Sequence, residues 1–242
     1  MRALVKNENE SLISGLPGFS VLDLFHPDIT EQTREELFTL ACEFHVRYFP
    51  ESPHAIDEWR AHIQTGESPT RERVHVWLIF KDTKPVGMWA VNVNIESGVA
   101  LMLFGAVDKE ARSNLPHTWL RSFLDALIEL CVTECEVLGR KVDLVALESE
   151  MGLKNRWESA GFALINVPYF EPTLGMHWAN APEVTFYENN HLFVRSLDPN
   201  TRSDSTDSAQ RALQAFVVAH YQLDVTIPQV ATMLSQEHER NA

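Results

Sequence analysis

The chain has little of what disulfide-stabilised, cysteine-ligated metal and membrane proteins need. Only three of its 242 residues are cysteine, and Cys42, Cys131 and Cys135 have neither a disulfide-like nor a metal-like spacing. Cys131 and Cys135 are four residues apart in a helical pattern, so we expect small core side chains in a cytoplasmic protein. No uncharged apolar run approaches the roughly 20 residues that span a bilayer, so we expect no membrane partner.

Positive charge is also scarce. The chain has 20 Lys and Arg against 34 Asp and Glu, which gives a formal net charge of −14. A general nucleic-acid binder needs a basic face, and no cluster of Lys and Arg interleaved with aromatic residues occurs. We therefore expect no nucleic-acid partner. An acidic surface is compatible with cationic substrates such as amines, and equally with solubility alone.

The ten histidines form no metal-binding pattern. No HxH, HxxxH or HExxH sequence occurs, and His54 and His62, two helical turns apart, lack a carboxylate partner. No GxSxG nucleophile elbow is present either. We expect no metal.

The hydrophobic pattern predicts a domain in which strands and helices are mixed. Apolar residues at helical spacing, among them Leu37 and Phe44, predict an amphipathic helix. Short β-rich apolar runs separated by turns at 82–85 and 97–98 predict a three-strand antiparallel meander. We expect strands over 19–24, 74–80, 86–95, 99–107, 142–147, 162–169 and 190–197, and helices over 31–48, 56–63, 115–138, 153–160, 209–221 and 228–238.

One polar segment divides the chain. Residues 198–208 include no apolar side chain of the aliphatic or aromatic kind and are rich in Asp and Ser, which predicts a linker. It separates a main domain, 19–197, from a C-terminal helical extension, 209–242, and an N-terminal segment, 1–18, precedes both. We expect the extension to pack on the main domain or on a second copy of the chain, which leaves a homodimer open.

The order of elements resembles that of the Gcn5-related N-acetyltransferase (GNAT) fold. Three motifs carry the resemblance: Pro-Val-Gly at 85–87, LFGAVDKEAR at 103–112, and NRWESAGF at 155–162. The LFGAVDKEAR motif is similar to the family's fourth strand with the acidic-then-basic loop after it, and NRWESAGF is similar to a family ending usually written LYEKLGF. The resemblance covers about residues 19–197.

The resemblance implies an α/β (α+β) fold with a mixed, mostly antiparallel central sheet and flanking helices. It also implies a splay between strands 99–107 and 142–147, the family's fourth and fifth strands, in which acetyl-CoA or another acyl-CoA lies as co-substrate. By position, three residues of the fourth strand are expected to contact the thioester end of acyl-CoA, and the loop after that strand is expected to bind the pyrophosphate. The residues assigned to acyl-CoA in this way are Gly105, Ala106, Val107, Arg112, Ser113, Asn114, Leu115, His117, Thr118, Asn155 and Trp157.

Three positions depart from the family pattern R/Q-x-x-G-x-G/A. Leu115 and His117 stand where glycines would let the backbone approach the phosphates, and Pro116 has no N–H. One interpretation is a modified site in which Arg112 and His117 supply the charge. The other is an ordinary helix start capped by Ser113 or Asn114.

A further departure concerns the acid that protonates the leaving thiolate. Trp157 stands where many family members have a tyrosine, and an indole N–H is no useful acid at neutral pH. Trp157 is therefore interpreted as a packing residue as well as a neighbour of the cofactor. The loss of the tyrosine and both glycines keeps open an alternative, a catalytically degenerate GNAT-fold binding or interaction protein.

Five polar residues are candidates for the chemistry and the acceptor pocket. Glu148, just beyond strand 142–147, is the first choice for a base or an amine-orienting carboxylate, and Glu96 in a turn is the second. His75 and Asn92 lie on neighbouring meander strands, and Tyr169 follows the sixth strand, so these three are candidates for substrate binding. The resulting hypothesis is an acyl-CoA-dependent N-acyltransferase that acts on an amine of a small molecule or protein by direct attack in a ternary complex.

Overall fold

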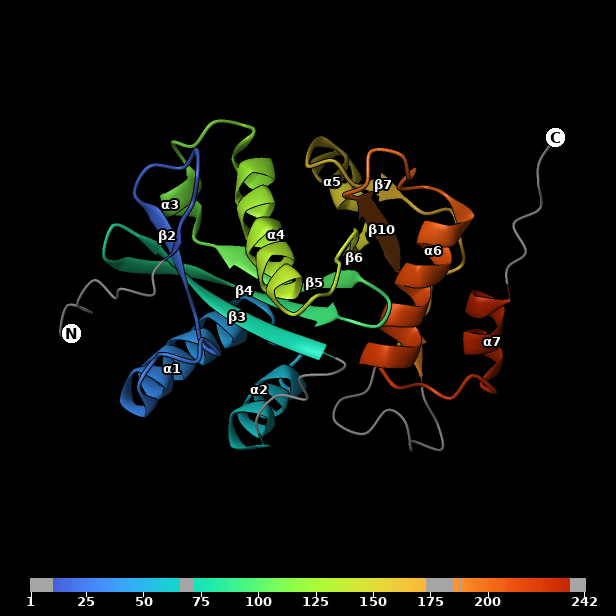
Figure 1. Ribbon diagram of the computed structural model, residues 1–242, viewed down its shortest axis with the longest axis horizontal. Helices are drawn as coiled ribbons and strands as arrows, with labels where there is room; N and C mark the ends of the chain where they lie inside the picture. Colours follow the sequence, from blue (N-terminus) through green and yellow to red (C-terminus); the bar gives the residue numbers. More distant parts are fainter. Residues whose placement is uncertain (1–10, 66–71, 173–184, 188, 236–242) are drawn as a thin grey trace. The chain divides into compact units, whose positions relative to one another are not determined.

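The structure is a computed structural model that describes residues 11–65, 72–172, 185–187 and 189–235 (Figure 1). Eight strands form one mostly antiparallel sheet in the order β1-β2-β3-β4-β5-β6-β10-β7, and β8 and β9 form a second, two-stranded sheet. The chain divides into two compact units: residues 1–69, 73–92 and 102–130, and residues 70–72, 93–101 and 131–242. The mixed α/β class with a mostly antiparallel sheet and flanking helices is confirmed.

The first unit contains the meander and the four helices that flank it. One part of each of the elements β3, β4, β5 and α4 belongs to the second unit. The elements are β1 (Ser11–Leu12), β2 (Phe19–Asp23), α1 (Glu31–Tyr48), α2 (His54–Thr65), β3 (Glu72–Lys81), β4 (Lys84–Asn94), β5 (Val99–Val107), α3 (Lys109–Arg112) and α4 (Trp119–Val137).

The two faces of β4 are covered by different helices. Successive side chains of a strand point to opposite faces. Met88 and Ala90 belong to a core cluster with residues of α1 and α2, whereas Trp89 packs against Phe123 of α4, with ring centroids 5.5 Å apart. Figure 1 shows the same arrangement, with α1 and α2 on one side of the meander and α4 on the other.

The second unit is built on the long antiparallel pair of β6 and β10. Their register runs from Asn190 opposite Glu150 to Ser196 opposite Leu144, and Phe193 of β10 also faces Leu164 of β7. The elements are β6 (Leu144–Glu150), a 3₁₀ turn η1 (Met151–Leu153), α5 (Lys154–Ser159), β7 (Ala163–Leu164), β8 (Glu171–Pro172), β9 (Phe186–Tyr187), β10 (Asn190–Ser196), α6 (Thr206–Leu213), a π-helix η3 (Gln214–His220) and α7 (Pro228–Leu234).

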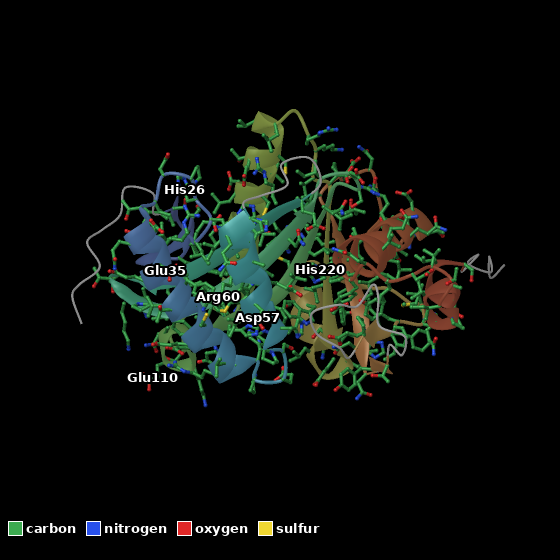
Figure 2. All side chains as sticks on the ribbon, turned by 90° about the horizontal axis from the view of Figure 1, so that it is seen from below. His26, Glu35, Asp57, Arg60, Glu110 and His220 are labelled. Atoms are coloured by element: carbon green, nitrogen blue, oxygen red, sulfur yellow. The ribbon has the colours of Figure 1, made fainter. Side chains whose placement is uncertain are left out.

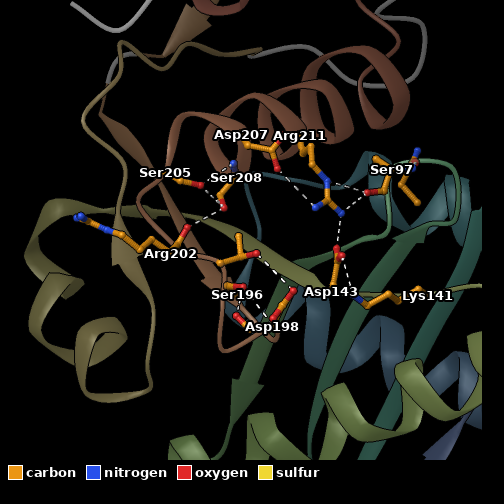
Figure 3. Close-up of polar contacts among 12 residues, drawn as sticks. Ser97, Lys141, Asp143, Ser196, Asp198, Arg202, Ser205, Asp207, Ser208 and Arg211 are labelled. Atoms are coloured by element: carbon orange, nitrogen blue, oxygen red, sulfur yellow. Dashed lines mark hydrogen bonds and ion pairs between the residues drawn. The ribbon is translucent and has the colours of Figure 1, made fainter. Parts of the chain in front are cut away.

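The C-terminal helices belong to this second unit. α6 contacts β6 and β10, and Arg211 donates from Nη2 and Nε to the Ser97 carbonyl at 2.6 and 3.2 Å. Arg211 also pairs with Asp143, whose other oxygen lies 3.3 Å from Lys141 Nζ (Figure 3). The predicted packing of the extension on the same chain is therefore seen within this unit.

α6 begins inside the segment predicted to be a linker. Ser205 Oγ accepts from the Ser208 N–H at 3.2 Å, so an N-cap starts the helix at Thr206 rather than at 209. Ser196 and Asp198 bond to one another just before it (Figure 3). The predicted last helix, 228–238, is seen as α7, and its part beyond 235 lies outside the described residues.

Two further predictions of element boundaries were wrong. The helix predicted from 115 begins at Trp119, because the first α-type bond joins the Ser122 N–H to the Thr118 carbonyl. The strand predicted over 162–169 is only β7 (Ala163–Leu164), after which the Ile165 N–H makes one more bond, to the Leu192 carbonyl at 2.9 Å.

Among the described residues, no helix combines the length and the apolar composition of a membrane-spanning segment, and no three metal-binding side chains cluster. Cys131 and Cys135 are buried, as predicted for core side chains. Gly139 has φ +68°, and the Arg140 N–H reaches the Cys135 carbonyl at 2.8 Å, so this glycine ends α4 in a left-handed cap.

Candidate functional site

The loop after β5 is anchored at its start to the end of α1. Tyr48 donates its hydroxyl to Asp108 Oδ1 at 2.5 Å, and Arg47 lies 3.5 Å from the same oxygen. The hydrogen bond to this carboxylate raises the pKa of Tyr48. Arg112 donates Nε to the Val107 carbonyl at 3.2 Å. One donor of Arg112 thus closes the loop onto the strand end, and its other guanidinium N–H groups can meet an anion.

Half of the six backbone N–H donors between Ser113 and Trp119 are already used. The N–H groups of Ser113, Leu115 and Trp119 donate to carbonyls three residues earlier, at 3.4, 3.2 and 2.9 Å. Pro116 has none. The Ser113 hydroxyl donates to the carbonyl of Glu110 at 2.9 Å and ends α3, so its predicted role as cap of the following helix was wrong.

The exposed remainder of the loop keeps some capacity for an anion. Asn114, His117 and Thr118 are exposed, and within the described residues their N–H groups donate to no backbone carbonyl. Together with the Arg112 guanidinium, these groups form a set of possible donors. A glycine-rich loop would offer mainly backbone N–H groups, whereas this loop offers side-chain donors as well. A phosphate would be held here mainly by side-chain charge.

Gly105 has a packing role that the resemblance did not indicate. A Cβ at Gly105 would lie 2.4 Å from the Trp89 indole, and one at Gly87 would lie 2.2 Å from the Ala106 carbonyl oxygen. Both glycines therefore allow β4 and β5 to approach closely. Gly105 and Ala106 keep partial exposure, and Val107 is buried.

A surface pocket of about 430 Å³ adjoins the first residues of this loop. It is lined by the β3–β4 turn together with Asp108, Glu110 and Ala111, and Glu110 is labelled in Figure 2. A second pocket, of about 640 Å³, lies between α1 and α2, where Arg60 stacks over the Phe38 ring at 4.6 Å. No residue predicted for the site lines either pocket.

His75 is part of a buried polar pair. Its Nδ1 donates to Asp23 Oδ2 at 2.6 Å, and the other Asp23 oxygen accepts from the N–H groups of Phe25 and Val76 at 3.0 and 3.3 Å. The imidazole also stacks on Trp77, with centroids 4.7 Å apart. These contacts give His75 a structural role in joining β2 to β3, and Asp23 was not among the predicted residues.

The other two polar candidates of the meander lie in different surroundings. Asn92 is buried within β4, whereas Glu96 is exposed in the turn between β4 and β5. The turn itself is held by Asn94, whose Oδ1 accepts from the Ser97 N–H and hydroxyl at 2.9 and 2.8 Å. Roles for Asn92 and Glu96 in binding or catalysis stay predictions.

Glu148 lies within β6 and not beyond its end, because pairing with β10 extends to Glu150. Its side chain is the centre of what we call the Glu148 cluster, made of Glu148, Tyr169, Tyr221 and Glu171. Tyr169 donates its hydroxyl to Glu148 Oε1, and Tyr221 donates to Oε2 at 2.6 Å. Two predicted residues, Glu148 and Tyr169, thus meet, and a tyrosine of the C-terminal segment joins them.

The environment of Glu148 favours its protonated form. Its pKa is raised well above the ordinary value, first by burial and then by the charge of Glu171, while the hydrogen bond from Tyr221 acts in the opposite direction. Glu171, on β8, accepts in turn from the Asn190 side-chain amide. A carboxyl group with a raised pKa can accept and release a proton nearer neutral pH than an exposed glutamate can.

The residues of the NRWESAGF motif lie on α5 and just after it. Trp157 packs edge-on against Phe162, with centroids 6.1 Å apart, and its buried Nε1 has no partner among the described residues. Asn155 is exposed. The contact supports packing as one role of Trp157, and contact of either residue with acyl-CoA stays a prediction.

Comparison with solved structures identifies the fold. A protein assigned to the GNAT family of acetyltransferases from Bacteroides thetaiotaomicron superposes with a TM-score of 0.53 at 17% identity, covering 84% of this chain and 99% of that one. The chain therefore has the GNAT fold, as its element order predicted.

Weaker matches belong to the same class. An acetyltransferase from Salmonella typhimurium that modifies the N-terminal serine of ribosomal protein L7/L12 gives 0.45 at 11% identity, covering 75% of this chain and 96% of that one. A GNAT family acetyltransferase from Elizabethkingia anophelis with acetyl-CoA bound gives 0.42 at 10%, covering 75% and 99%. No family profile and no curated protein matches the sequence.

Proposed function

We propose that the protein is an acyl-CoA-dependent N-acyltransferase that transfers an acyl group, most simply acetyl, to an amine. The observation that carries the proposal is a carboxyl group of raised pKa, Glu148, held by two tyrosine hydroxyls in a chain that has the GNAT fold. The proposed acceptor is an amine of a small molecule or of a protein.

Glu148 suits the first step of this reaction. An amine acceptor is an ammonium ion at neutral pH and must lose a proton before its nitrogen can attack. The Glu148 carboxylate would take that proton, and the free amine would attack the thioester carbonyl carbon. The C–S bond then breaks, CoA leaves as the thiolate, and a proton from solvent converts it to the thiol.

The loop after β5 supplies the proposed CoA-binding residues. Donors for the pyrophosphate come from the Arg112 guanidinium, the ring of the exposed His117 and the hydroxyl of the exposed Thr118. Gly105, Ala106 and Val107 would meet the thioester end through backbone groups. The fit is partial, because Pro116 has no N–H and the N–H groups of Ser113 and Leu115 are bonded within the loop.

That internal bonding favours a second candidate, a GNAT-fold protein that binds partners without catalysis. Pro116 lacks an N–H, and three neighbouring N–H groups donate to nearby carbonyls, so a loop of this kind can be a purely structural helix connection. This candidate predicts no acyl-CoA binding.

Isothermal titration with acetyl-CoA and longer acyl-CoAs separates the two candidates. We expect binding to the full chain, weakened about tenfold or more by Arg112→Ala through the loss of a charged contact. Arg140→Ala, the same change at an exposed arginine of the other unit, is the matched control and should bind as the unmodified chain does. Absence of binding at millimolar acyl-CoA would eliminate the enzyme and leave the interaction protein.

A further inference from the structure

The C-terminal segment contains an unusual backbone just before it reaches the Glu148 cluster. α6 widens into the seven-residue π-helix η3, and the Tyr221 N–H donates to the Phe216 carbonyl, five residues earlier, at 2.8 Å. π-helical segments are rare and often lie at functional sites. The next residue, Gln222, has φ +52°, a left-handed conformation that disfavours a side chain with a Cβ.

These two features bracket Tyr221. Backbone strain of this kind persists only where the surrounding structure fixes it, and an observed outlier points to a functional constraint. Tyr221 is buried, and its ring packs against the rings of Phe216 and His220, at centroid distances of 6.1 and 4.9 Å. Its hydroxyl ends 2.6 Å from Glu148 Oε2.

Tyr169 approaches the same carboxyl group from a different part of the chain. It is buried, packs edge-on against Phe216 at 6.4 Å, and donates to Glu148 Oε1. Each oxygen of Glu148 is therefore fixed by one hydroxyl, one from the loop before β8 and one from the C-terminal segment. Phe216, which is fully buried, supports both tyrosine rings.

We propose that Tyr221 is a positioning residue of the candidate active site, placed by the π-helix so that it and Tyr169 together orient the Glu148 carboxyl group. The C-terminal segment then completes the site rather than being an appendage to it. The catalytic meaning of this arrangement rests on the proposed acyltransferase function. The two-tyrosine arrangement itself does not, and can be tested without activity.

The surroundings of Glu148 determine whether its pKa rises or falls when one tyrosine hydroxyl is removed. Glu171 on β8 faces it with a like charge, Tyr169 and Tyr221 donate to it, and its partner across β10, Leu192, is apolar. His220 packs beside Tyr221. Hydroxyl donors favour the ionised carboxylate and lower the pKa of Glu148, whereas burial and Glu171 raise it. Removing one hydroxyl should therefore raise this pKa.

The test is a pH titration of the Glu148 carboxyl carbon by NMR in full-length protein labelled with δ-¹³C-glutamate, with Glu148→Gln for assignment. Tyr221→Phe should raise the pKa of Glu148 by about one pH unit, the size expected for one hydrogen bond to a charged group. Tyr187→Phe, the same change at an exposed tyrosine, should leave it unchanged. An unchanged Glu148 titration in Tyr221→Phe would overturn the proposal.

Two additional measurements keep the outcome decisive. In Glu148→Gln the Cζ resonance of Tyr221 should shift while that of Tyr187 does not, which tests the contact even if Tyr221→Phe fails to fold. If the chain acylates amines, the acidic limb of kcat/KM against pH should move upward in Tyr221→Phe by the same amount, a shift that a merely structural residue would not cause. If no amine is acylated but the carboxyl titration moves, the proposed function fails and the positioning role of Tyr221 stands.

Discussion

Glu148 combines features that folding stability alone does not favour. Its carboxyl group has a raised pKa because it is enclosed and faces Glu171. Between the ordinary pKa and the raised one, the folded chain keeps a proton that the unfolded chain has released, so stability falls as pH rises through this window. Groups that oppose folding in this way are typical of functional sites.

The first prediction concerns the replacement of this carboxyl group by a neutral amide of the same shape. Glu148→Gln should raise the free energy of unfolding at pH 8 by about 1 kcal/mol, and by less as the pH falls toward 5, because a raised pKa favours the neutral form of the wild-type group at lower pH. Glu150→Gln, at an exposed position of the same strand, should change it by less than about 0.5 kcal/mol. Urea unfolding at both pH values measures this, and a Glu148→Gln chain less stable than wild type at pH 8 contradicts the account.

His45 gives a pH dependence of the opposite sign. It is fully buried on α1, donates Nε2 to the Ser52 carbonyl at 2.7 Å, and contacts Trp59 edge-on at 5.0 Å. Burial is the main cause that lowers the pKa of His45, and burial also lowers that of His54 and His62. The unfolded chain therefore binds more protons below about pH 6.5, and stability present above that pH is lost as pH falls.

The second prediction follows for His45→Gln. Wild type should lose unfolding free energy between pH 7 and pH 5, and this loss should be smaller by about 1 kcal/mol in His45→Gln. Equal slopes in wild type and His45→Gln, from urea titrations at four pH values, would show that His45 is protonated without cost.

At the scale of elements, β4 and β5 approach one another closely because β5 carries a glycine opposite a tryptophan. Gly105→Ala would place a methyl group 2.4 Å from the Trp89 indole. We expect a loss of about 1–3 kcal/mol of unfolding free energy, the usual effect of overpacking. Gly152→Ala, where nothing lies within 4 Å, should be near neutral. Chemical denaturation compares the two, and equal stabilities would mean that Trp89 moves aside freely.

Elements with strong local signals were predictable from the sequence. α1 was predicted with both ends correct, because Thr30 caps its start and Pro50 follows its end. Gly139, which ends α4, has φ +68°, a left-handed conformation that glycine adopts readily. These features depend on a few adjacent residues, whose chemistry determines the backbone directly.

The features that build the Glu148 cluster depend on distant residues and were only half predictable. Glu148 and Tyr169 were candidates, but Tyr221 lies 73 residues from Glu148, and nothing in the local pattern links them. The widening of α6 into η3 has no periodicity of its own over seven residues. In the loop before α4, the sequence showed the loss of glycines but not that Ser113, Leu115 and Trp119 bond internally.

At the scale of the whole molecule, the C-terminal segment is part of the core of the second unit. Ala212, Leu213 and Phe216 are at most 2% exposed, and Arg211 ties α6 to Asp143. The apolar face of α6 and η3 is thus covered within its own unit and does not need a second chain.

The fourth prediction tests this placement. Phe216→Ala should lower the free energy of unfolding by about 3–5 kcal/mol through cavity formation, with no change in molecular mass by light scattering. Val218→Ala, on the exposed side of η3, should cost less than about 1 kcal/mol. A change of mass in Phe216→Ala, with little loss of stability, would instead make this face a contact between copies.

The most direct test of the central claim is amine-dependent release of CoA thiol from acetyl-CoA, followed across a panel of small-molecule and peptide amines. We expect release by wild type and by Glu150→Gln, and a rate about 100-fold lower for Glu148→Gln at pH 7.5, the usual effect of losing a general base. A Glu148→Gln protein as active as wild type, or a wild-type protein that binds acetyl-CoA and acylates no amine in the panel, would contradict it.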